Sequence, residues 1–456
     1  MGKFNYEILN MAIEFLLKKF KENEHEPAII WKEQTFNYSD LLLKYSDAKK
    51  IIKDNLIKKG VVVSLNADFT PNAIAFLLAL VENDNIIVPF NFPLKEVIKN
   101  EIAEVEVEIL FNIENDTFLI NKRECIAKHE YYQTLRQRKS AGLVLFTSGT
   151  SGFPKGAVHD FNKLLNKFRT VRKSMRTINF LLFDHWGGLN TLFHTLSNCG
   201  VVLALRNRKP EAVCEFIEKY NIELLPVSPS FLNLLIISEK YKKYNLSSLK
   251  LITYGTEPMP ESTLKRAKEI FSHVTFQQTY GLIELGVLRS KSKSDDSLWV
   301  KLGGEGFELR IVENNLQIKS ESAMLGYLNA PSPFTEDGFF ITGDEVEYDG
   351  EYYKILGRKS EIINVGGDKV YPQEVENIIL EMSNINEVTV YGEKHAIIGN
   401  IVCAKVSLNE PEDAKEFIRK LKSHCKLKLQ SFKVPVKVFI TDEQMYSDRF
   451  KKQRKL

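Results

Sequence analysis

The sequence lacks the features that mark several protein classes. Its longest purely apolar run, residues 73–81, is nine residues long, whereas about 20 are needed to span a bilayer. The five cysteines are scattered and form no CxxC pair, which argues against a disulfide framework or a zinc site and favours a reducing compartment. The N-terminal residues lack the apolar core of a signal peptide. We therefore expect a cytoplasmic protein without a transmembrane segment.

An excess of charge of one sign is also missing. Lys and Arg number 62 against 59 Asp and Glu, a net charge of +3, and the two signs alternate along the 456 residues. Without a polybasic arm or an acidic tail, the sequence indicates no nucleic-acid partner. With 44% hydrophobic residues, the chain has enough apolar mass for a sizeable core. The oligomeric state is left open.

Short apolar runs alternate with stretches of helical periodicity through most of the chain. Strands are expected at 28–31, 34–38, 61–65, 86–89, 201–205, 223–227 and 249–254, and helices at 8–20, 39–53 and 73–81. This alternation is typical of βαβ units and predicts an α/β fold with a largely parallel sheet. After Gly303 the pattern changes to short strands with tight turns. We place a domain boundary near Gly357, with an N-terminal domain at 1–357 and a C-terminal α+β domain at 358–456.

A glycine- and hydroxyl-rich segment follows the apolar strand predicted at 143–146. This segment, residues 147–156, reads TSGTSGFPKG. Backbone N–H groups freed by glycine, together with Ser and Thr hydroxyls, can surround anionic oxygens, and a lysine adds a point charge. The spacing is not that of GxxxxGK[ST], because Lys155 is followed by Gly156. The segment predicts a phosphate-binding loop of another type.

This loop resembles that of the adenylate-forming enzymes, the superfamily of acyl-CoA synthetases, peptide-synthetase adenylation domains and luciferase. Other segments resemble the later family motifs in the same order: YGTEP from Tyr254, QTYGLIE from Gln278, TGD from Thr342 and GRKSEIINVGGDKVYPQEVE from Gly357. The likeness covers nearly the whole chain and is closest to the acyl-CoA synthetase branch of fatty acid–CoA ligases.

The resemblance implies a nucleotide site. In the family an aromatic residue, here Tyr280, stacks on adenine, and the turn carboxylate, here Asp344, takes both ribose hydroxyls; a carboxylate can accept both bonds. Glu284 matches the magnesium ligand, and Mg²⁺ usually takes one or two carboxylates plus phosphate. The implied ATP- and AMP-binding residues are Thr147, Ser148, Gly149, Thr150, Ser151, Gly152, Lys155, Gly255, Thr256, Glu257, Tyr280, Gly281, Asp344 and Arg358.

The resemblance also implies a two-step reaction and a mobile C-terminal lid. A carboxylate and ATP would give acyl-adenylate and pyrophosphate, and a thiol would then displace AMP to form a thioester. Lys155, Mg²⁺ and a lysine from the C-terminal tail would supply positive charge. The family tail reads Pro-x-Thr-x-x-Gly-Lys-x-x-Arg; here Ser447, Lys451 and Arg454 keep that register. We assign Lys451 as the tail lysine, with Lys452 as the alternative.

Several positions depart from the family pattern. Ile283 stands where a Thr or Ser usually donates to the α-phosphate, and Ser360 stands at the hinge where Asp or Lys is usual. The tail has Met445 and Phe450 in place of the family's Pro and Gly. These departures affect the expected rate and nucleotide affinity and leave the implied chemistry unchanged.

The acid and the thiol are predicted only by class. His185 lies where acyl-CoA synthetases have an aromatic or His gating the carboxylate pocket, which favours an uncharged acyl chain, whereas Asp184 could instead hold an amino acid's ammonium group. Gly366 and Gly367 would let the backbone approach a pantetheine arm, belonging to coenzyme A or to an acyl carrier protein. The leading hypothesis is a fatty or other acyl acid–thiol ligase. The alternatives are an amino- or hydroxy-acid adenylating enzyme and a nucleotide-binding relic.

Overall fold

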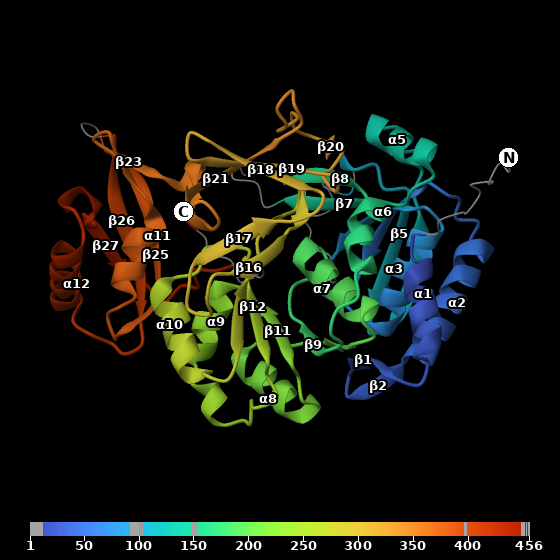
Figure 1. Ribbon diagram of the computed structural model, residues 1–456, viewed down its shortest axis with the longest axis horizontal. Coiled ribbons are helices and arrows are strands. Elements are labelled where there is room, and N and C mark those ends of the chain that lie inside the picture. Colours follow the sequence, from blue (N-terminus) through green and yellow to red (C-terminus); the bar gives the residue numbers. More distant parts are fainter. Residues whose placement is uncertain are drawn as a thin grey trace. The chain divides into compact units, whose positions relative to one another are not determined.

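The computed structural model describes residues 12–91, 100, 102, 104–147, 154–395, 399–447, 452 and 454 (Figure 1). The chain divides into two compact units. Unit 1 comprises Met1–Arg206, Ile283–Val287 and Glu321–Pro333, and unit 2 comprises Asn207–Leu282, Leu288–Ser320 and Phe334–Leu456.

The described residues of unit 1 form a seven-stranded sheet in the order β20-β8-β7-β4-β3-β5-β6. The strands are β3 (Val62–Asn66), β4 (Ile86–Phe90), β5 (Ile109–Glu114), β6 (Thr117–Lys122), β7 (Gly142–Thr147), β8 (Lys155–Asp160) and β20 (Gly326–Tyr327). The four central strands, β7, β4, β3 and β5, are parallel. β3 and β4 are buried along their whole length, as expected of parallel strands covered on both faces.

The outer strands of this sheet are antiparallel, which the prediction of a largely parallel sheet did not include. β6 pairs with β5, and β8 pairs with β7 and β20. The β5–β6 connection is two residues long, Asn115 and Asp116, with φ values of 50° and 70°. Two residues with positive φ make the tight hairpin turn that joins antiparallel neighbours. The sheet is therefore parallel at its centre, and the hairpins β5–β6 and β7–β8 add antiparallel strands on its two sides.

A second group of strands in unit 1 follows the order β9-β10-β1-β2. Its strands are β1 (Pro27–Trp31), β2 (Gln34–Asn37), β9 (Arg176–Asn179) and β10 (Val201–Ala204). The helices of unit 1 include α1 (Glu14–Glu22), α2 (Tyr38–Asp54), α3 (Pro71–Glu82), α5 (Glu130–Arg138), α6 (Phe161–Leu165) and α7 (Trp186–Ser197), and η1 spans Asn166–Arg169. The helix predicted at 8–20 corresponds to α1, and residues 8–11 lie outside the described part.

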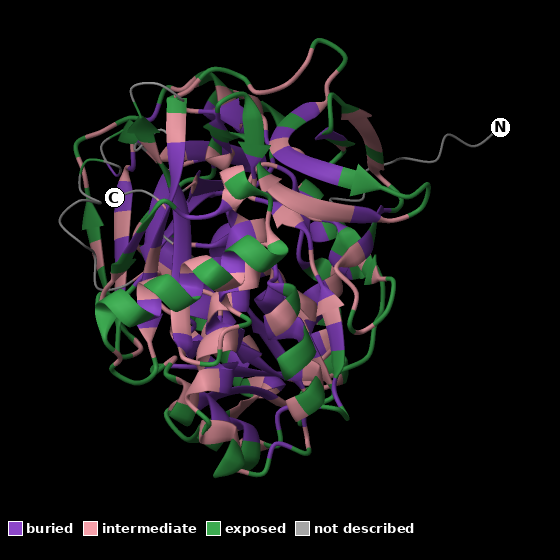
Figure 2. Cartoon of the chain, turned by 90° about the vertical axis from the view of Figure 1, so that its left-hand side faces the viewer, coloured by how far each residue is buried: buried purple, intermediate pink, exposed green. Residues whose placement is uncertain are grey.

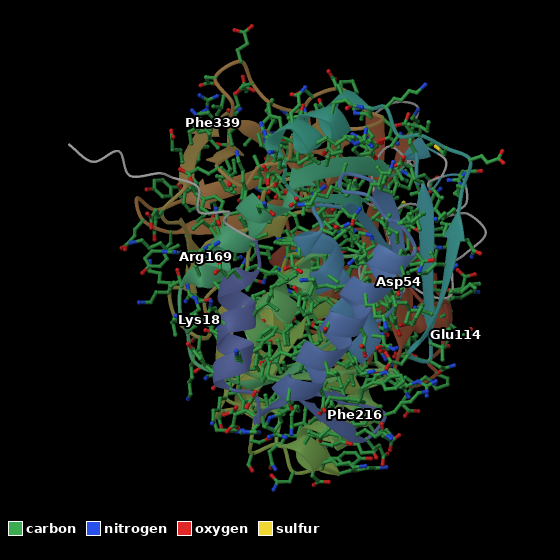
Figure 3. The ribbon with its side chains drawn as sticks, turned by 90° about the vertical axis from the view of Figure 1, so that its right-hand side faces the viewer. Lys18, Asp54, Glu114, Arg169, Phe216 and Phe339 are labelled. Atoms are coloured by element: carbon green, nitrogen blue, oxygen red, sulfur yellow. The ribbon has the colours of Figure 1, made fainter. Side chains whose placement is uncertain are left out.

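The apolar run at 73–81 forms α3, a helix buried along that whole run. The Thr70 hydroxyl accepts a hydrogen bond from the Ala73 backbone N–H at 3.2 Å, and Pro71 occupies the first turn, both of which are typical of a helix start. At the surface, the Arg169 guanidinium lies 4.7 Å from the ring centroid of Phe15 on α1. Figure 3 shows Arg169 beside α1, with Lys18 on the same helix and Asp54 at the end of α2.

Unit 2 begins with three parallel strands in the order β13-β12-β11, namely β11 (Leu224–Val227), β12 (Leu251–Tyr254) and β13 (Thr275–Gln278). They alternate with α8 (Pro210–Tyr220), α9 (Pro229–Ile237) and α10 (Glu261–Ile270). An antiparallel six-stranded sheet follows, in the order β16-β17-β22-β21-β19-β18. Its strands are β16 (Arg289–Ser292), β17 (Trp299–Gly303), β18 (Phe307–Val312), β19 (Asn315–Ser320), β21 (Phe340–Tyr348) and β22 (Tyr353–Arg358). The predicted change to short strands with tight turns is present, but it begins at β16, ahead of Gly303, and β21 is nine residues long.

The C-terminal part of unit 2 is an α+β module with its own core. Its strands are β23 (Ile363–Val365), β24 (Asp368–Val370), β25 (Ile385–His395), β26 (Gly399–Leu408) and β27 (Lys437–Ile440), and its helices are α11 (Pro372–Ile379) and α12 (Ala414–Lys428). Phe417, Leu421 and Cys425 of α12 pack into this core, and Figure 1 shows α12 along the β25–β27 sheet. The predicted fold class, a large N-terminal α/β part and a small C-terminal α+β part, is confirmed.

Burial follows this division into strands and covering helices. Figure 2 shows buried residues along the strands and exposed residues mainly on helix faces and loops. Among the described residues, no helix is both long and apolar enough to cross a membrane.

Candidate active site

The predicted phosphate loop connects two paired strands of unit 1. Thr147, the last residue of β7, lies directly opposite Lys155, the first residue of β8. The loop predicted from sequence therefore closes an antiparallel hairpin. Its inner candidates, Ser148, Gly149, Thr150, Ser151 and Gly152, lie outside the described residues.

Asn329 holds the downstream end of this loop. Its side-chain oxygen accepts from the Gly156 backbone N–H at 3.0 Å, and its side-chain NH₂ donates to the Pro154 carbonyl at 3.0 Å. Both contacts are to backbone on either side of Lys155. Asn329 thus fixes the chain segment that carries the candidate phosphate-binding lysine.

Tyr327 links Lys155 to Glu284, the candidate magnesium ligand. The Tyr327 hydroxyl donates to Glu284 Oε1 at 2.6 Å. The Lys155 Nζ lies 5.3 Å from the centroid of the Tyr327 ring, within the range of a cation–π contact. Tyr327 is nearly buried and belongs to β20, which pairs with β8 two residues beyond Lys155. One aromatic side chain therefore positions both charged candidates.

The backbone around Glu284 is tied to the Ser322–Met324 segment. The Met324 N–H donates to the Glu284 carbonyl at 2.8 Å, and the Ser322 hydroxyl donates to the Leu285 carbonyl at 3.0 Å. His159 of β8 is fully buried next to Ile283 and Ser322. Burial lowers the pKa of His159 to about 4, although backbone hydrogen bonds involving Ile283 and Ser322 partly oppose the shift. The histidine is neutral at pH 7 and acts as a packed core residue.

In unit 2, Gly255 allows two candidate nucleotide-binding segments to touch. A Cβ added at position 255 would lie 2.5 Å from the Thr279 hydroxyl and 2.6 Å from the Thr279 carbonyl oxygen. The next residue, Thr256, has φ +73°, an uncommon value for a residue with a Cβ. The YGTEP and QTYG segments are therefore in backbone contact, as their joint assignment to one nucleotide site requires.

The carboxylate of Glu257 is engaged by backbone donors. Glu257 Oε1 accepts from the Ser230 N–H at 2.8 Å, and Oε2 accepts from the Lys452 N–H at 3.1 Å. Ser230 is in the first turn of α9, where N–H groups have no intrahelical partner. The structure thus gives Glu257 a role in holding chain segments together, and its direct contact with nucleotide stays a prediction.

Tyr280 and Asp344, predicted to meet adenine and ribose, are bonded to each other. The Tyr280 hydroxyl donates to Asp344 Oδ2 at 2.6 Å, and Arg358 Nε lies 3.4 Å from Oδ1. Burial, and next the Asp344 charge, raises the pKa of Tyr280 well above its ordinary value, so the phenol stays protonated as a donor. Because a carboxylate has about four lone-pair sites, Asp344 can keep both contacts and still accept from ligand hydroxyls. Gly281 follows in the short strand β14 (Gly281–Leu282).

His185 begins α7 in unit 1. Its Nδ1 accepts from the Gly187 backbone N–H at 3.0 Å, and the residue is buried. An accepting Nδ1 places the proton of the neutral ring on Nε2. His185 therefore has a structural role, because it accepts a hydrogen bond at the start of α7. Its gating of an acid pocket stays a prediction.

Gly366 and Gly367 form the two-residue turn between β23 and β24. Their φ values are +61° and +100°, a combination that glycine adopts without strain. No described atom lies within 4 Å of an added Cβ at either position. The turn geometry alone accounts for both glycines, and their contact with pantetheine stays a prediction.

The tail lysine assignment falls partly outside the described residues, because Lys451 is not among them. Lys452, the alternative, is described: its Nζ donates to Glu376 Oε2 at 2.9 Å. Arg454 Nη2 contacts the same oxygen at 2.9 Å. The structure therefore shows a group around Lys155 and Glu284 within unit 1. Within unit 2 it shows a group around Asp344 and a tail held by the buried carboxylate of Glu376.

Two family models match the chain. Residues 17–319 match the AMP-binding enzyme model and residues 374–451 match the AMP-binding enzyme C-terminal domain model. The chain belongs to the AMP-binding enzyme family. The resemblance to adenylate-forming enzymes drawn from the motifs is confirmed.

Curated relatives of this AMP-binding enzyme are named as CoA ligases. Indoleacetate–CoA ligase of Aromatoleum aromaticum is 30% identical over 66% of this chain and 63% of its own length. Long-chain-fatty-acid–CoA ligase of Haemophilus influenzae is 26% identical over 70% and 62%. 2-Succinylbenzoate–CoA ligase of Enterococcus faecalis is 23% identical over 93% and 94%. The matches to the first two relatives thus span slightly less than two thirds of those proteins.

Solved structures show the same fold. The anthranilate–CoA ligase AuaEII in complex with anthranoyl-AMP has a TM-score of 0.83 at 18% identity, over 97% of this chain and 95% of that one. ATP-bound MatB from Rhodopseudomonas palustris has a TM-score of 0.79 at 21% identity, over 95% and 96%. The chain therefore has the fold of these AMP-binding enzymes over nearly its full length.

Proposed function

We propose that the protein is an ATP-dependent acid–thiol ligase that forms an acyl-adenylate and then an acyl thioester, with release of AMP and pyrophosphate. The observation that carries the proposal is the Lys155–Tyr327–Glu284 arrangement, in which one phenol positions a cation and a carboxylate beside the phosphate loop. Such an arrangement suits stabilisation of charge on a transferring phosphoryl or nucleotidyl group. Membership of the AMP-binding enzyme family supports the same activity.

Glu284 fits a magnesium ion that is bound together with nucleotide. Among the described residues no group of three or more His, Cys, Asp and Glu side chains could hold a metal. Mg²⁺ is usually held by one or two carboxylates, waters and substrate phosphates, so a single carboxylate near the phosphate loop is a suitable partner. When bound there, the ion would neutralise phosphate charge. The Tyr327 hydroxyl bond to Oε1 would fix the direction in which Glu284 presents its carboxylate.

In the first step, we infer that a substrate carboxylate oxygen attacks the α-phosphorus of ATP and the bond to the bridging oxygen of pyrophosphate breaks. Lys155 and the tail lysine Lys451 would face the developing negative charge. Asp344, oriented by Tyr280 and Arg358, would hold the ribose, with the Gly255–Thr279 contact beside adenine. In the second step a thiolate attacks the acyl carbonyl and AMP leaves.

Support for the substrate class comes from the names of relatives, which include CoA ligases for indoleacetate and for long-chain fatty acids. We therefore infer a fatty or aryl acid as substrate, with coenzyme A as the thiol because these relatives are named as CoA ligases.

Carboxylate-dependent exchange of labelled pyrophosphate into ATP tests this function. Purified protein would be assayed with fatty, aryl, hydroxy and amino acids, with and without Mg²⁺. The proposal predicts exchange with fatty or aryl acids that requires Mg²⁺. Exchange with amino or hydroxy acids alone would overturn the substrate class. ATP binding without exchange under any acid would overturn the ligase activity.

A further inference from the structure

The C-terminal tail of unit 2 lines a cavity together with five other segments. These are the start of α9, the stretch from Glu257 to Pro260, the first turn of α10 at Thr263, α11 and β25. The tail contributes Met445, Tyr446, Lys452 and Arg454 to the walls. The cavity therefore brings the end of the chain against segments that lie 57 to 225 residues earlier in the sequence.

At the centre of these contacts is Glu376 of α11, whose side chain is only 1% exposed. Its carboxylate accepts from Lys452 Nζ at 2.9 Å, from Arg454 Nη2 at 2.9 Å and from the Val390 N–H at 2.9 Å. A buried carboxylate must be paired with cations and hydrogen-bonded to remain ionised. Burial by itself raises the pKa of Glu376, but the Arg454 and Lys452 charges outweigh it and lower the pKa to about 2.

The two tail cations are themselves largely enclosed. Side-chain exposure is 18% for Lys452 and 16% for Arg454. Arg454 also reaches Glu361 at 2.9 Å, so its guanidinium bridges two carboxylates. The geometry suits arginine, whose planar fork can hold two acceptors at once.

A second carboxylate holds the backbone of the same tail residue. Glu257 Oε2 accepts from the Lys452 N–H at 3.1 Å while Oε1 accepts from the Ser230 N–H of α9. Lys452 is thus fixed through its side chain by the C-terminal module and through its backbone by the YGTEP segment. Withdrawing the Lys452 ammonium to serve a phosphate would take away one of the two cations that compensate Glu376.

We propose that Glu376 and Glu257 position the C-terminal tail, and that Lys452 is an anchor of this tail and not the lysine that contacts substrate. The inference deepens the proposed function, on which it rests, because it leaves Lys451 as the lysine for the adenylation step. Glu376 and Glu257 act here as positioning residues.

The first test compares Lys451→Met with Lys452→Met in the two half-reactions. The probe is the acid that gives the fastest pyrophosphate exchange with the unchanged protein, and the second half-reaction starts from supplied acyl-adenylate and coenzyme A. We expect Lys452→Met to retain exchange within about tenfold and Lys451→Met to lose it by about a thousandfold or more, with thioester formation spared. Greater loss of exchange in Lys452→Met than in Lys451→Met would overturn the proposal.

The second test needs no enzymatic activity, so it separates failure of the anchor from failure of the ligase. Limited trypsin digestion followed by intact mass measures cleavage after Lys452, and Glu376→Gln should speed that cleavage at least fivefold. Glu381→Gln, which removes a surface pair with Lys428, is the matched control and should leave the rate unchanged. Equal tail cleavage in Glu376→Gln and the control would overturn the anchor whether or not exchange is seen.

Because Glu376 is buried, Arg454→Gln provides a variant that leaves α11 intact. It removes the bridge between Glu376 and Glu361 and should also speed cleavage after Lys452. Circular dichroism and the melting temperature would show that each variant is folded before digestion. An unchanged cleavage rate in folded Arg454→Gln would likewise contradict the anchoring role.

Discussion

The Tyr327 hydroxyl donates a 2.6 Å hydrogen bond to Glu284, and the same ring faces the ammonium of Lys155. Tyr327 and Glu284 are 43 positions apart in sequence, and the pairing of β20 with β8 places Tyr327 close to Lys155. The bond fixes a carboxylate that is proposed to bind magnesium, while the ring offers its negative face to a lysine. Tyr327 is therefore a positioning residue for both charges.

Replacing Tyr327 with Phe should weaken magnesium–nucleotide binding while keeping the fold. The ring and its cation–π contact remain, but Glu284 loses a hydrogen bond worth about 1.5–3 kcal/mol for a charged acceptor. We expect the Mg²⁺ concentration for half-maximal exchange to rise about tenfold. Titration of Mg²⁺ at saturating ATP measures it, with Tyr348→Phe as the control at an exposed turn. An unchanged Mg²⁺ dependence would show that the bond has no positioning role.

A Gly255→Ala substitution should separate the YGTEP and QTYG segments. The new Cβ would meet the Thr279 carbonyl oxygen, which is backbone and cannot rotate away, and such overpacking typically costs about 1–3 kcal/mol. We expect a lower melting temperature and ATP binding weakened about tenfold, measured by thermal unfolding and calorimetry. Adding Thr279→Ala removes the hydroxyl and the γ-methyl group but leaves the backbone carbonyl in place, so it should not restore binding. Full rescue by that second change would contradict the backbone contact.

Asp344→Asn should impair nucleotide binding more than Tyr280→Phe does. The amide has one accepting oxygen in place of two, so when that oxygen stays with Arg358 its NH₂ group faces the Tyr280 hydroxyl, which must then accept instead of donate. The ribose hydroxyls lose an acceptor in the same change. Tyr280→Phe keeps the ring and removes a single hydroxyl. We expect the dissociation constant for AMP to rise about a hundredfold for Asp344→Asn and less than tenfold for Tyr280→Phe, measured by calorimetry. The reverse order would argue against a ribose role for Asp344.

His159 should make the fold sensitive to mild acid. Its pKa is about 4 in the folded protein against an ordinary 6.5, so between these values the unfolded chain binds a proton that the folded chain does not. The free energy of unfolding should therefore fall as pH drops from 6.5 to 4, by about 3 kcal/mol in total, and change no further from this group below pH 4.

Urea unfolding of the unchanged protein and of His159→Leu at pH 7, 6 and 5 measures this effect. The pKa of His194 is also lowered to about 4, but it is present in both proteins and its contribution cancels in the comparison. We expect the leucine variant to lose less stability between pH 7 and 5, whatever its stability at pH 7. Parallel pH profiles for the two proteins would contradict the assignment.

The sequence predicted the strand and helix alternation well because buried apolar runs are local signals. The run at 73–81 is an example: its lack of polar residues predicted a buried helix, and the structure adds that Thr70 caps the helix start. Gly366 and Gly367 were predicted to allow close approach of a pantetheine arm, which stays a prediction, and the tight turn between β23 and β24 that they form was not predicted. The antiparallel pairing of the edge strands was not predicted. The direction in which two strands pair depends on the length of their connection, and the two-residue turn Asn115–Asp116 makes β5 and β6 antiparallel.

Residues that act through distant partners could not be found in this way. Tyr327 and Asn329 lie in a stretch, GYLN, that no predicted motif included, and their partners are 43 and about 175 positions away. Glu376 stood within the PQEVE motif, but its pairing with Lys452 spans 76 positions. Sequence spacing alone left Lys451 and Lys452 as competitors, and the contact of Lys452 with the buried Glu376 carboxylate supports the proposal that Lys452 is the anchor.

Transfer of oxygen from substrate to product tests the central claim most directly. The acid most active in exchange would be labelled with ¹⁸O in its carboxylate and incubated with ATP, Mg²⁺, coenzyme A and the protein. Formation of an acyl-adenylate predicts one ¹⁸O atom in each AMP released, because the attacking carboxylate oxygen stays on the α-phosphorus. Label in inorganic phosphate with ADP as product, or AMP free of label, would contradict an adenylate-forming mechanism.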